Sequence, residues 1–198
     1  MDSELKEEIC RVMKELYERG LVSALTGNVS ARLPSANEFW ITPSGVHKGR
    51  LTPSSLLKLD MDLKVLEGSG KPSIESMAHA RIYRVRPDVN AIVHAHNPIT
   101  VGLAMAGVSI KPLVEGSVIG SVEVVPFAPP GSRELAESVE EKAKKANALI
   151  LQRHGVMTLG ANLTEAEALA ESLEDASKSV LVYALMKLKG AWRPSAPS

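Results

Sequence analysis

The sequence ALILQRHGVMTLG, residues 148–160, contains two apolar runs joined by a short polar break. Residues 148–152 and 156–159 have the composition of buried strands, and the break holds Arg153, His154 and Gly155. A parallel crossover needs about a dozen residues or more, so two strands this close run antiparallel. The pattern therefore predicts a sheet in which antiparallel pairs dominate.

Further strands are indicated by short apolar runs between Gly, Pro, Ser and Asn turns, at residues 29–33, 38–42, 56–60, 62–66, 89–96, 111–115 and 122–127. Helical spacing of apolar residues predicts helices that end near Gly20 and Pro87, and others at residues 99–107 and 132–146. The last long helix is predicted to open with a capping box of Thr164 and Glu167 and to run to about residue 189.

This order of elements predicts an α/β fold, in which helices cover both faces of a mixed, mostly antiparallel sheet. No linker rich in Gly, Pro or Ser marks a domain boundary. We therefore expect residues 1–190 to form a single domain and residues 191–198, which lack any periodic pattern, to be a mobile tail.

The composition predicts a soluble globular protein without a nucleic-acid or membrane partner. Lys plus Arg and Asp plus Glu each number 23 among 198 residues, so no net charge attracts nucleic acid or an anionic membrane. No apolar stretch approaches the ~20 residues that span a bilayer, and the acidic N-terminal sequence MDSELKEEIC lacks the apolar core of a signal peptide. We expect a cytoplasmic location.

The stretch VHAHNP, residues 93–98, places two histidines at the end of a predicted strand. His94 and His96 share one face because side chains alternate along a strand, and His154 lies at the break in the first stretch. Three imidazoles with an open fourth position are typical of a catalytic zinc, although Co, Fe and Mn also suit imidazole. The alternative is that these are hydrogen-bonded core or turn histidines.

Other polar residues are candidates beside the histidines. Glu75 is predicted in the first turn of a helix, either as a functional acid or as a carboxylate that complements the helix dipole. His79 follows at the same helix face, as a supporting residue at most, and His47 is expected to be solvated in a loop beside Lys48. The loops TGN (26–28) and PSG (43–45) are either phosphate cradles or ordinary turns.

Six motifs in order resemble the class II aldolase/adducin family: GNVS (27–30), TPSG (42–45), PSIE (72–75), HAH (94–96), GSREL (131–135) and QRHG (152–155). The resemblance spans nearly the whole chain. It implies a three-layer α/β/α fold with a largely antiparallel sheet of about nine strands. It also implies a homotetramer with active sites at the subunit interfaces.

The resemblance carries site roles onto matching positions. His94, His96 and His154 would bind zinc, and Glu75 would contact the metal at rest and act as catalytic acid/base. The substrate phosphate would be held by Asn28, Ser44, Gly45 and Ser73. The implied reaction cleaves a ketose 1-phosphate, such as L-fuculose 1-phosphate, into dihydroxyacetone phosphate and lactaldehyde through a zinc-stabilised enediolate. No Schiff-base lysine is required, which agrees with the absence of an obvious buried lysine in the sequence.

The sequence also departs from the family pattern. Ile74 follows Ser73 where the aldolases have a second serine, and the stretch IKPLVEGSV (110–118) lacks their tyrosine proton donor. Glu115 in that stretch is either a replacement acid/base or an exposed charge. The alternatives are therefore an epimerase, a dehydratase or a decarboxylase of a phosphorylated sugar, and a non-enzymatic adducin-like interaction domain. A cupin-type metal site fits less well, because its strands lack intervening helices.

Overall fold

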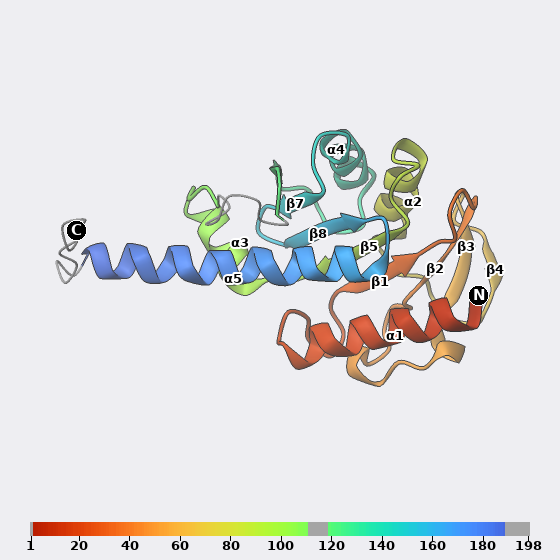
Figure 1. Ribbon diagram of the computed structural model, residues 1–198. Helices are drawn as coiled ribbons and strands as arrows, with labels where there is room; N and C mark the ends of the chain where they lie inside the picture. The colour runs from red at the N-terminus through yellow and green to blue at the C-terminus, as the bar shows by residue number, and fades with distance from the viewer. Residues whose placement is uncertain (1, 111–118, 189–198) are drawn as a thin grey trace.

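The computed structural model describes residues 2–110 and 119–188 (Figure 1). Three predictions lie outside the described residues: the strand at 111–115, the role of Glu115, and the tail at 191–198. The strands are β1 (Asn28–Ala31), β2 (Glu38–Ile41), β3 (Leu57–Asp60), β4 (Val65–Glu67), β5 (Ala91–Ala95), β6 (Val122–Val125), β7 (Ala148–Leu151) and β8 (Gly155–Gly160).

The strands form one sheet in the order β4-β3-β2-β1-β5-β8-β7-β6. All neighbouring pairs are antiparallel except β6 and β7, so the predicted mixed, mostly antiparallel sheet is confirmed. The described residues contain eight strands, compared with the nine or so that were expected. Residues 148–160 form β7 and β8, which pair antiparallel with Ile150 opposite Val156.

Helices cover both faces of the sheet, which confirms the three-layer arrangement (Figure 1). One face packs against α1 (Asp2–Glu18), α3 (Pro98–Met105) and α5 (Leu163–Leu188), and the other packs against α2 (Ser76–Val85) and α4 (Arg133–Ala143). Alternation along β5 explains the two cores, because Val93 and Ala95 belong to the first and Ile92 to the second. Among the described helices, none is long and apolar enough to cross a membrane.

The start of α5 differs from the prediction. The helix begins at Leu163, and the side chain of Asn162 accepts a 2.9 Å hydrogen bond from the backbone N–H of Glu165. The Glu165 carboxylate in turn accepts a 2.9 Å bond from the backbone N–H of Ala161. The predicted Thr164/Glu167 capping box is therefore wrong by two residues, since Asn162 is an equally good cap and lets the helix begin earlier.

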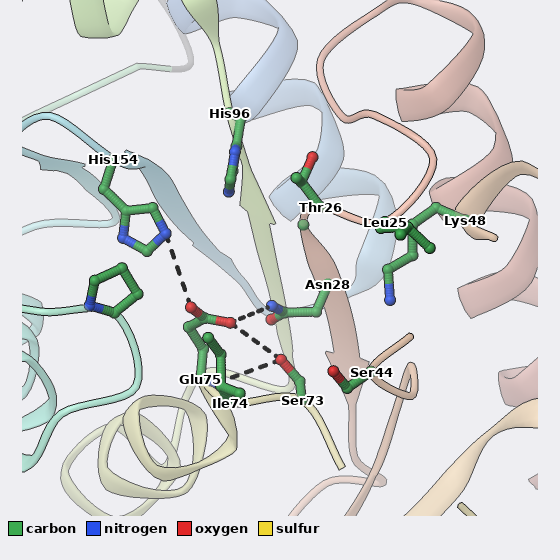
Figure 2. A pocket seen from close by; sticks show the side chains of 12 residues that line it. Leu25, Thr26, Asn28, Ser44, Lys48, Ser73, Ile74, Glu75, His96 and His154 are labelled. Atoms are coloured by element: carbon green, nitrogen blue, oxygen red, sulfur yellow. Dashed lines mark hydrogen bonds and ion pairs between the residues drawn. The ribbon is translucent and has the colours of Figure 1, made fainter. Parts of the chain in front are cut away.

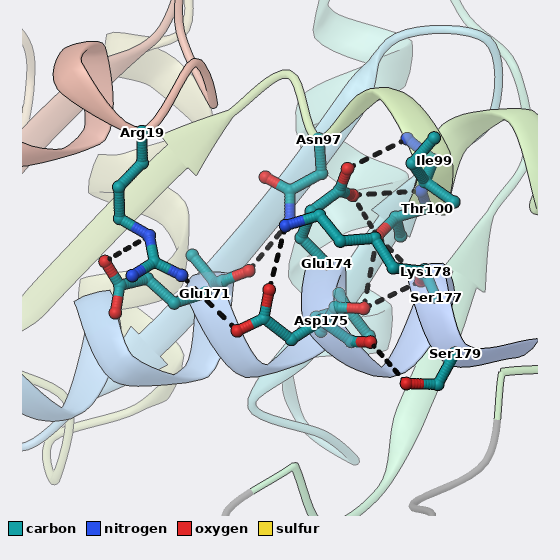
Figure 3. A network of polar contacts seen from close by, with 12 residues as sticks. Arg19, Asn97, Ile99, Thr100, Glu171, Glu174, Asp175, Ser177, Lys178 and Ser179 are labelled. Atoms are coloured by element: carbon teal, nitrogen blue, oxygen red, sulfur yellow. Dashed lines mark hydrogen bonds and ion pairs between the residues drawn. The ribbon is translucent and has the colours of Figure 1, made fainter.

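A buried carboxylate joins α5 to the beginning of α3 (Figure 3). Glu174, which is 1% exposed, accepts hydrogen bonds of 3.1 Å from the backbone N–H groups of Ile99 and Thr100 and of 2.9 Å from the Thr100 hydroxyl. These N–H groups lie at the N-terminus of α3, where they lack helical partners and the helix dipole favours a negative charge. Because α3 begins at Pro98, the last residue of VHAHNP, the long helix anchors the chain just beyond His96.

Candidate metal centre

Three histidines converge at one end of β5. His94 lies in β5, His96 follows the strand, and His154 lies in the turn between β7 and β8, and their ligand atoms all lie within 4.8 Å of one another. The Nε2 atoms of His94 and His96 are 3.3 Å apart. Two nitrogens each about 2.0–2.1 Å from a tetrahedral zinc would be about 3.3–3.4 Å apart, so this spacing suits a shared metal ion.

The turn between β7 and β8 directs His154 toward the other two histidines. Arg153 has a φ of 62°, a left-handed conformation that reverses the chain within the turn. A Cβ on Gly155 would lie 2.3 Å from the carbonyl oxygen of Ala95, 3.1 Å from His94 Cε1 and 3.2 Å from His96 Cδ2. Glycine at residue 155 therefore allows β8 to approach both the strand and its histidines.

The donor set has the protonation state that metal binding requires. Burial lowers the pKa of His94 to about 3 and that of His96 to about 4, and it also lowers the pKa of His154. His94 Nδ1 lies 2.9 Å from the carbonyl oxygen of Val156, so it carries the proton and leaves Nε2 free as a ligand. Within the described part of the chain, His154 Nδ1 is buried without a hydrogen-bond partner, unlike an ordinary core histidine. Three neutral imidazoles of this kind fit a divalent metal ion.

Glu75 faces the three histidines from the start of α2. It occupies the N-cap position, directly before the predicted first turn, and its side chain makes no capping hydrogen bond. Its Oε2 accepts hydrogen bonds from Asn28 Nδ2 at 3.0 Å and Ser73 Oγ at 3.1 Å, and its Oε1 lies 3.8 Å from His154 Nε2 (Figure 2). The carboxylate is 6% exposed and is held between these donors and the histidines.

A buried polar network fixes α2 on the sheet beneath Glu75. The hydroxyl of Ser30 in β1 lies 2.7 Å from both His79 Nδ1 and the Tyr83 hydroxyl. Burial lowers the pKa of His79 to about 3, so the ring is a neutral hydrogen-bonding partner. His79 therefore supports the helix that carries Glu75, and Ser30 and Tyr83 are partners that sequence patterns did not indicate.

Beside the histidines lies a pocket of about 280 Å³. It is lined by Leu25, Thr26, Gly27, Asn28, Ser44, Lys48, Ser73, Ile74, Glu75, His96, Pro130 and His154. A backbone bridge between Pro43 and Pro72, and a 2.9 Å bond from Ser44 N–H to the Lys71 carbonyl, bring two sequence-distant loops together. Three of the predicted phosphate ligands thus line one pocket, whereas Gly45 lies beside Ser44 and is not among the lining residues.

Lys48 is a residue of this pocket that the sequence did not reveal. It is 2% exposed, which corrects the expectation that no buried lysine is present. Its backbone N–H donates to the Ala24 carbonyl at 2.8 Å, and this tertiary contact draws the GVHKGR loop inward. His47 packs edge-on against the Tyr17 ring and is half-buried, so the expectation that it is solvated is also wrong. Nothing in the polar local sequence signals either burial.

The chain is similar in sequence and in fold to known proteins along most of its length. Residues 7–181 match the model of the class II aldolase and adducin N-terminal domain. The chain is 34% identical to 3-oxo-tetronate 4-phosphate decarboxylase of Haemophilus influenzae over 87% of its length and 85% of the relative. It is 33% identical to L-fuculose phosphate aldolase of Methanocaldococcus jannaschii over 92% of its length and 98% of the relative. The structure of L-fuculose-1-phosphate aldolase from Thermus thermophilus superposes with a TM-score of 0.80 at 32% identity, covering 96% of this chain and 98% of that one.

Proposed function

The chain belongs to the class II aldolase and adducin family, and from this premise we propose that it is a zinc-dependent carbon–carbon lyase acting on a phosphorylated ketose such as L-fuculose 1-phosphate. The observation that carries the proposal is the convergence of His94, His96 and His154 with the Glu75 carboxylate beside them. The complete ligand set favours catalysis over a purely adducin-like interaction domain. A single domain over residues 1–190 and a homotetramer are further parts of the proposal.

The histidines and Glu75 have separate roles in this reaction. The three imidazoles would hold a divalent ion, which would supply a Lewis acid for the substrate carbonyl and for the negative charge left by bond cleavage. Once the carbon–carbon bond breaks, the carbon next to the carbonyl must gain a proton, which Glu75 supplies; in the condensation direction Glu75 removes it. Glu75 lies beside the histidines for this transfer, 3.8 Å from His154.

The phosphate pocket is proposed to be formed by Asn28, Ser44, Gly45 and Ser73. Asn28 and Ser73 both donate to Glu75, so a phosphate that takes these donors competes directly with the carboxylate. Substrate binding would then free Glu75 at the moment when its proton transfer is required. This competition links recognition of one end of the substrate to proton transfer at the other.

A second candidate reaction is decarboxylation of a 3-oxo sugar acid phosphate. It is supported by the similarity to the Haemophilus influenzae decarboxylase. Loss of carbon dioxide leaves the same carbanion next to a carbonyl, and this carbanion requires one proton. Aldol cleavage also requires a base that deprotonates the hydroxyl of the departing aldehyde. Glu115 is proposed for that additional role.

A substrate panel on zinc-loaded protein tests the proposal. Release of dihydroxyacetone phosphate from L-fuculose 1-phosphate would identify an aldolase, and release of carbon dioxide from 3-oxo-tetronate 4-phosphate would identify a decarboxylase. Glu75→Gln should lower turnover by about 100-fold or more with the fold retained. The exposed Glu134→Gln is the matched control and should leave turnover unchanged.

Specific outcomes would contradict each part. If neither substrate reacts with metal-loaded protein, the lyase proposal is wrong. If Glu75→Gln turns over at the wild-type rate, Glu75 is not the acid/base. Glu115→Gln separates the two reactions, because its loss should slow aldol cleavage and leave decarboxylation intact.

A further inference from the structure

We propose that Lys48 is the cationic anchor for the anionic end of the substrate and thereby selects phosphorylated over neutral substrates. The inference rests on the proposed function, because it deepens the recognition step of the same pocket. The Lys48 side chain is buried, and a single hydrogen bond from its ammonium is formed with the described residues.

Lys48 is a buried cation that forms no close ion pair among residues 2–110 and 119–188, and the charge that favours its cationic form is the Glu75 carboxylate in the same pocket. Its ammonium donates a short hydrogen bond to the Pro43 carbonyl and forms no ion pair with a described carboxylate. An ammonium has three donors, so two are left for another acceptor. Burial of an unpaired charge is costly, which makes an anionic ligand the natural partner for this group.

The position of Lys48 fits the end of the pocket remote from the metal ligands. Its side chain lines the pocket with Asn28 and Ser44, and Figure 2 shows its amine on their side, across from His154. The Lys48 ammonium donates a hydrogen bond to the carbonyl of Pro43, the residue that precedes Ser44. Lys48 would supply the positive charge that pairs with a phosphate held by these neutral donors.

The charge balance of the pocket supports an anion at this position. Among the lining residues Glu75 is the one carboxylate, and it is already bonded to Asn28 and Ser73. Lys48 is the one lining side chain whose ordinary pKa keeps it cationic at neutral pH. Burial lowers its pKa to about 8 despite the opposing effect of the Glu75 carboxylate, and a bound phosphate dianion would favour the charged form further.

Phosphate binding by matched variants tests the assignment. The dissociation constant of inorganic phosphate is measured calorimetrically on zinc-loaded wild type, Lys48→Met, Lys48→Arg and Lys71→Met. Lys71 is an exposed lysine whose carbonyl bonds Ser44, so its substitution removes the same charge close to the pocket. Lys48→Met should weaken phosphate binding about 10-fold or more. Lys48→Arg should weaken it less, and Lys71→Met should change it by less than about 2-fold.

Unchanged phosphate affinity in folded Lys48→Met would overturn the inference. If that variant does not fold, the Lys48 ammonium is followed by NMR in the wild-type protein. Its signal should move on phosphate addition, and an unmoved signal at saturation would also overturn the assignment. If borohydride traps substrate covalently on Lys48, the residue is a Schiff-base nucleophile, and its role as an anion anchor is wrong.

The two proposals fail separately. Wild-type cleavage of a sugar phosphate with affinity independent of Lys48 would remove the anchor and retain the lyase. Phosphate binding that depends on Lys48, without cleavage of any panel substrate, would retain the anchor and remove the lyase.

Discussion

Replacing Gly155 by alanine should disrupt the metal centre without removing any of its ligands. The added Cβ would lie 2.3 Å from the Ala95 carbonyl oxygen, more than about 1 Å closer than ordinary van der Waals contact. The same atom would lie 3.1 Å from His94 Cε1 and 3.2 Å from His96 Cδ2. Because the closest neighbour is backbone, rotation of a side chain cannot relieve the overlap. β8 must therefore move away from β5.

The size of that movement sets the expected effects. Overpacking of a closely packed core costs about 1–3 kcal/mol, so the free energy of unfolding of the metal-free protein should fall by that amount. His154 precedes Gly155 directly, and a metal site requires its ligands to stay within about 0.5 Å of their places. A shift of about 1 Å between the two strands should weaken zinc binding by about 10- to 100-fold.

Zinc affinity is measured by competition with a chromophoric chelator, and stability by urea unfolding of the metal-free protein. The matched control is Gly102→Ala, because Gly102 is exposed within α3 and a Cβ there would meet nothing within 4 Å. The control should retain zinc affinity and gain about 0.4–1 kcal/mol in stability. Wild-type zinc affinity and an unchanged urea midpoint in Gly155→Ala would refute the steric reasoning.

Other predictions concern the ligands, the α3 junction and a buried acid. His94→Ala removes a proposed ligand and should weaken zinc binding at least about 100-fold in the same competition assay. Glu174→Ala leaves two backbone N–H groups of α3 without an acceptor and should lower the free energy of unfolding by about 2–5 kcal/mol, as measured in urea. Burial raises the pKa of Glu167 to about 8, so the folded state favours its protonated form, and stability is lost as pH rises toward that value. Glu167→Gln should therefore lose less stability than wild type between about pH 5 and pH 9, compared by urea midpoints; equal losses would contradict the assignment.

Local periodicity was sufficient to predict most of the fold. The two apolar runs around the break at residues 153–155 form β7 and β8, and the helical patterns form all five α-helices of the described chain. The alternation of a strand placed His94 and His96 on one face, and the structure shows their Nε2 atoms 3.3 Å apart. These successes depend on residues that are neighbours in sequence, where spacing alone determines which side chains share a face.

The failures concern contacts between distant segments. Whether Lys48 is solvated or buried depends on its bond to Ala24 and on the loop around Pro72, neither of which alters the local pattern. The pairing of Ser30 with His79 and Tyr83 similarly requires the packing of α2 on β1. The start of α5 was misplaced for a local reason, since Asn162 and Glu165 offer a second cap with the same spacing as Thr164 and Glu167, and the structure forms the first pair.

The choice between aldol cleavage and decarboxylation follows from a count of proton transfers. Aldol cleavage must remove a proton from a hydroxyl and add one to carbon, whereas decarboxylation requires only the second of these steps. Of the titratable residues that line the described pocket, His96 and His154 belong to the proposed ligand set, and Lys48 is proposed to hold the anion. Glu75 is then the remaining proton carrier. It is sufficient for decarboxylation, so any aldol cleavage measured in the panel requires a second group, the role proposed for Glu115.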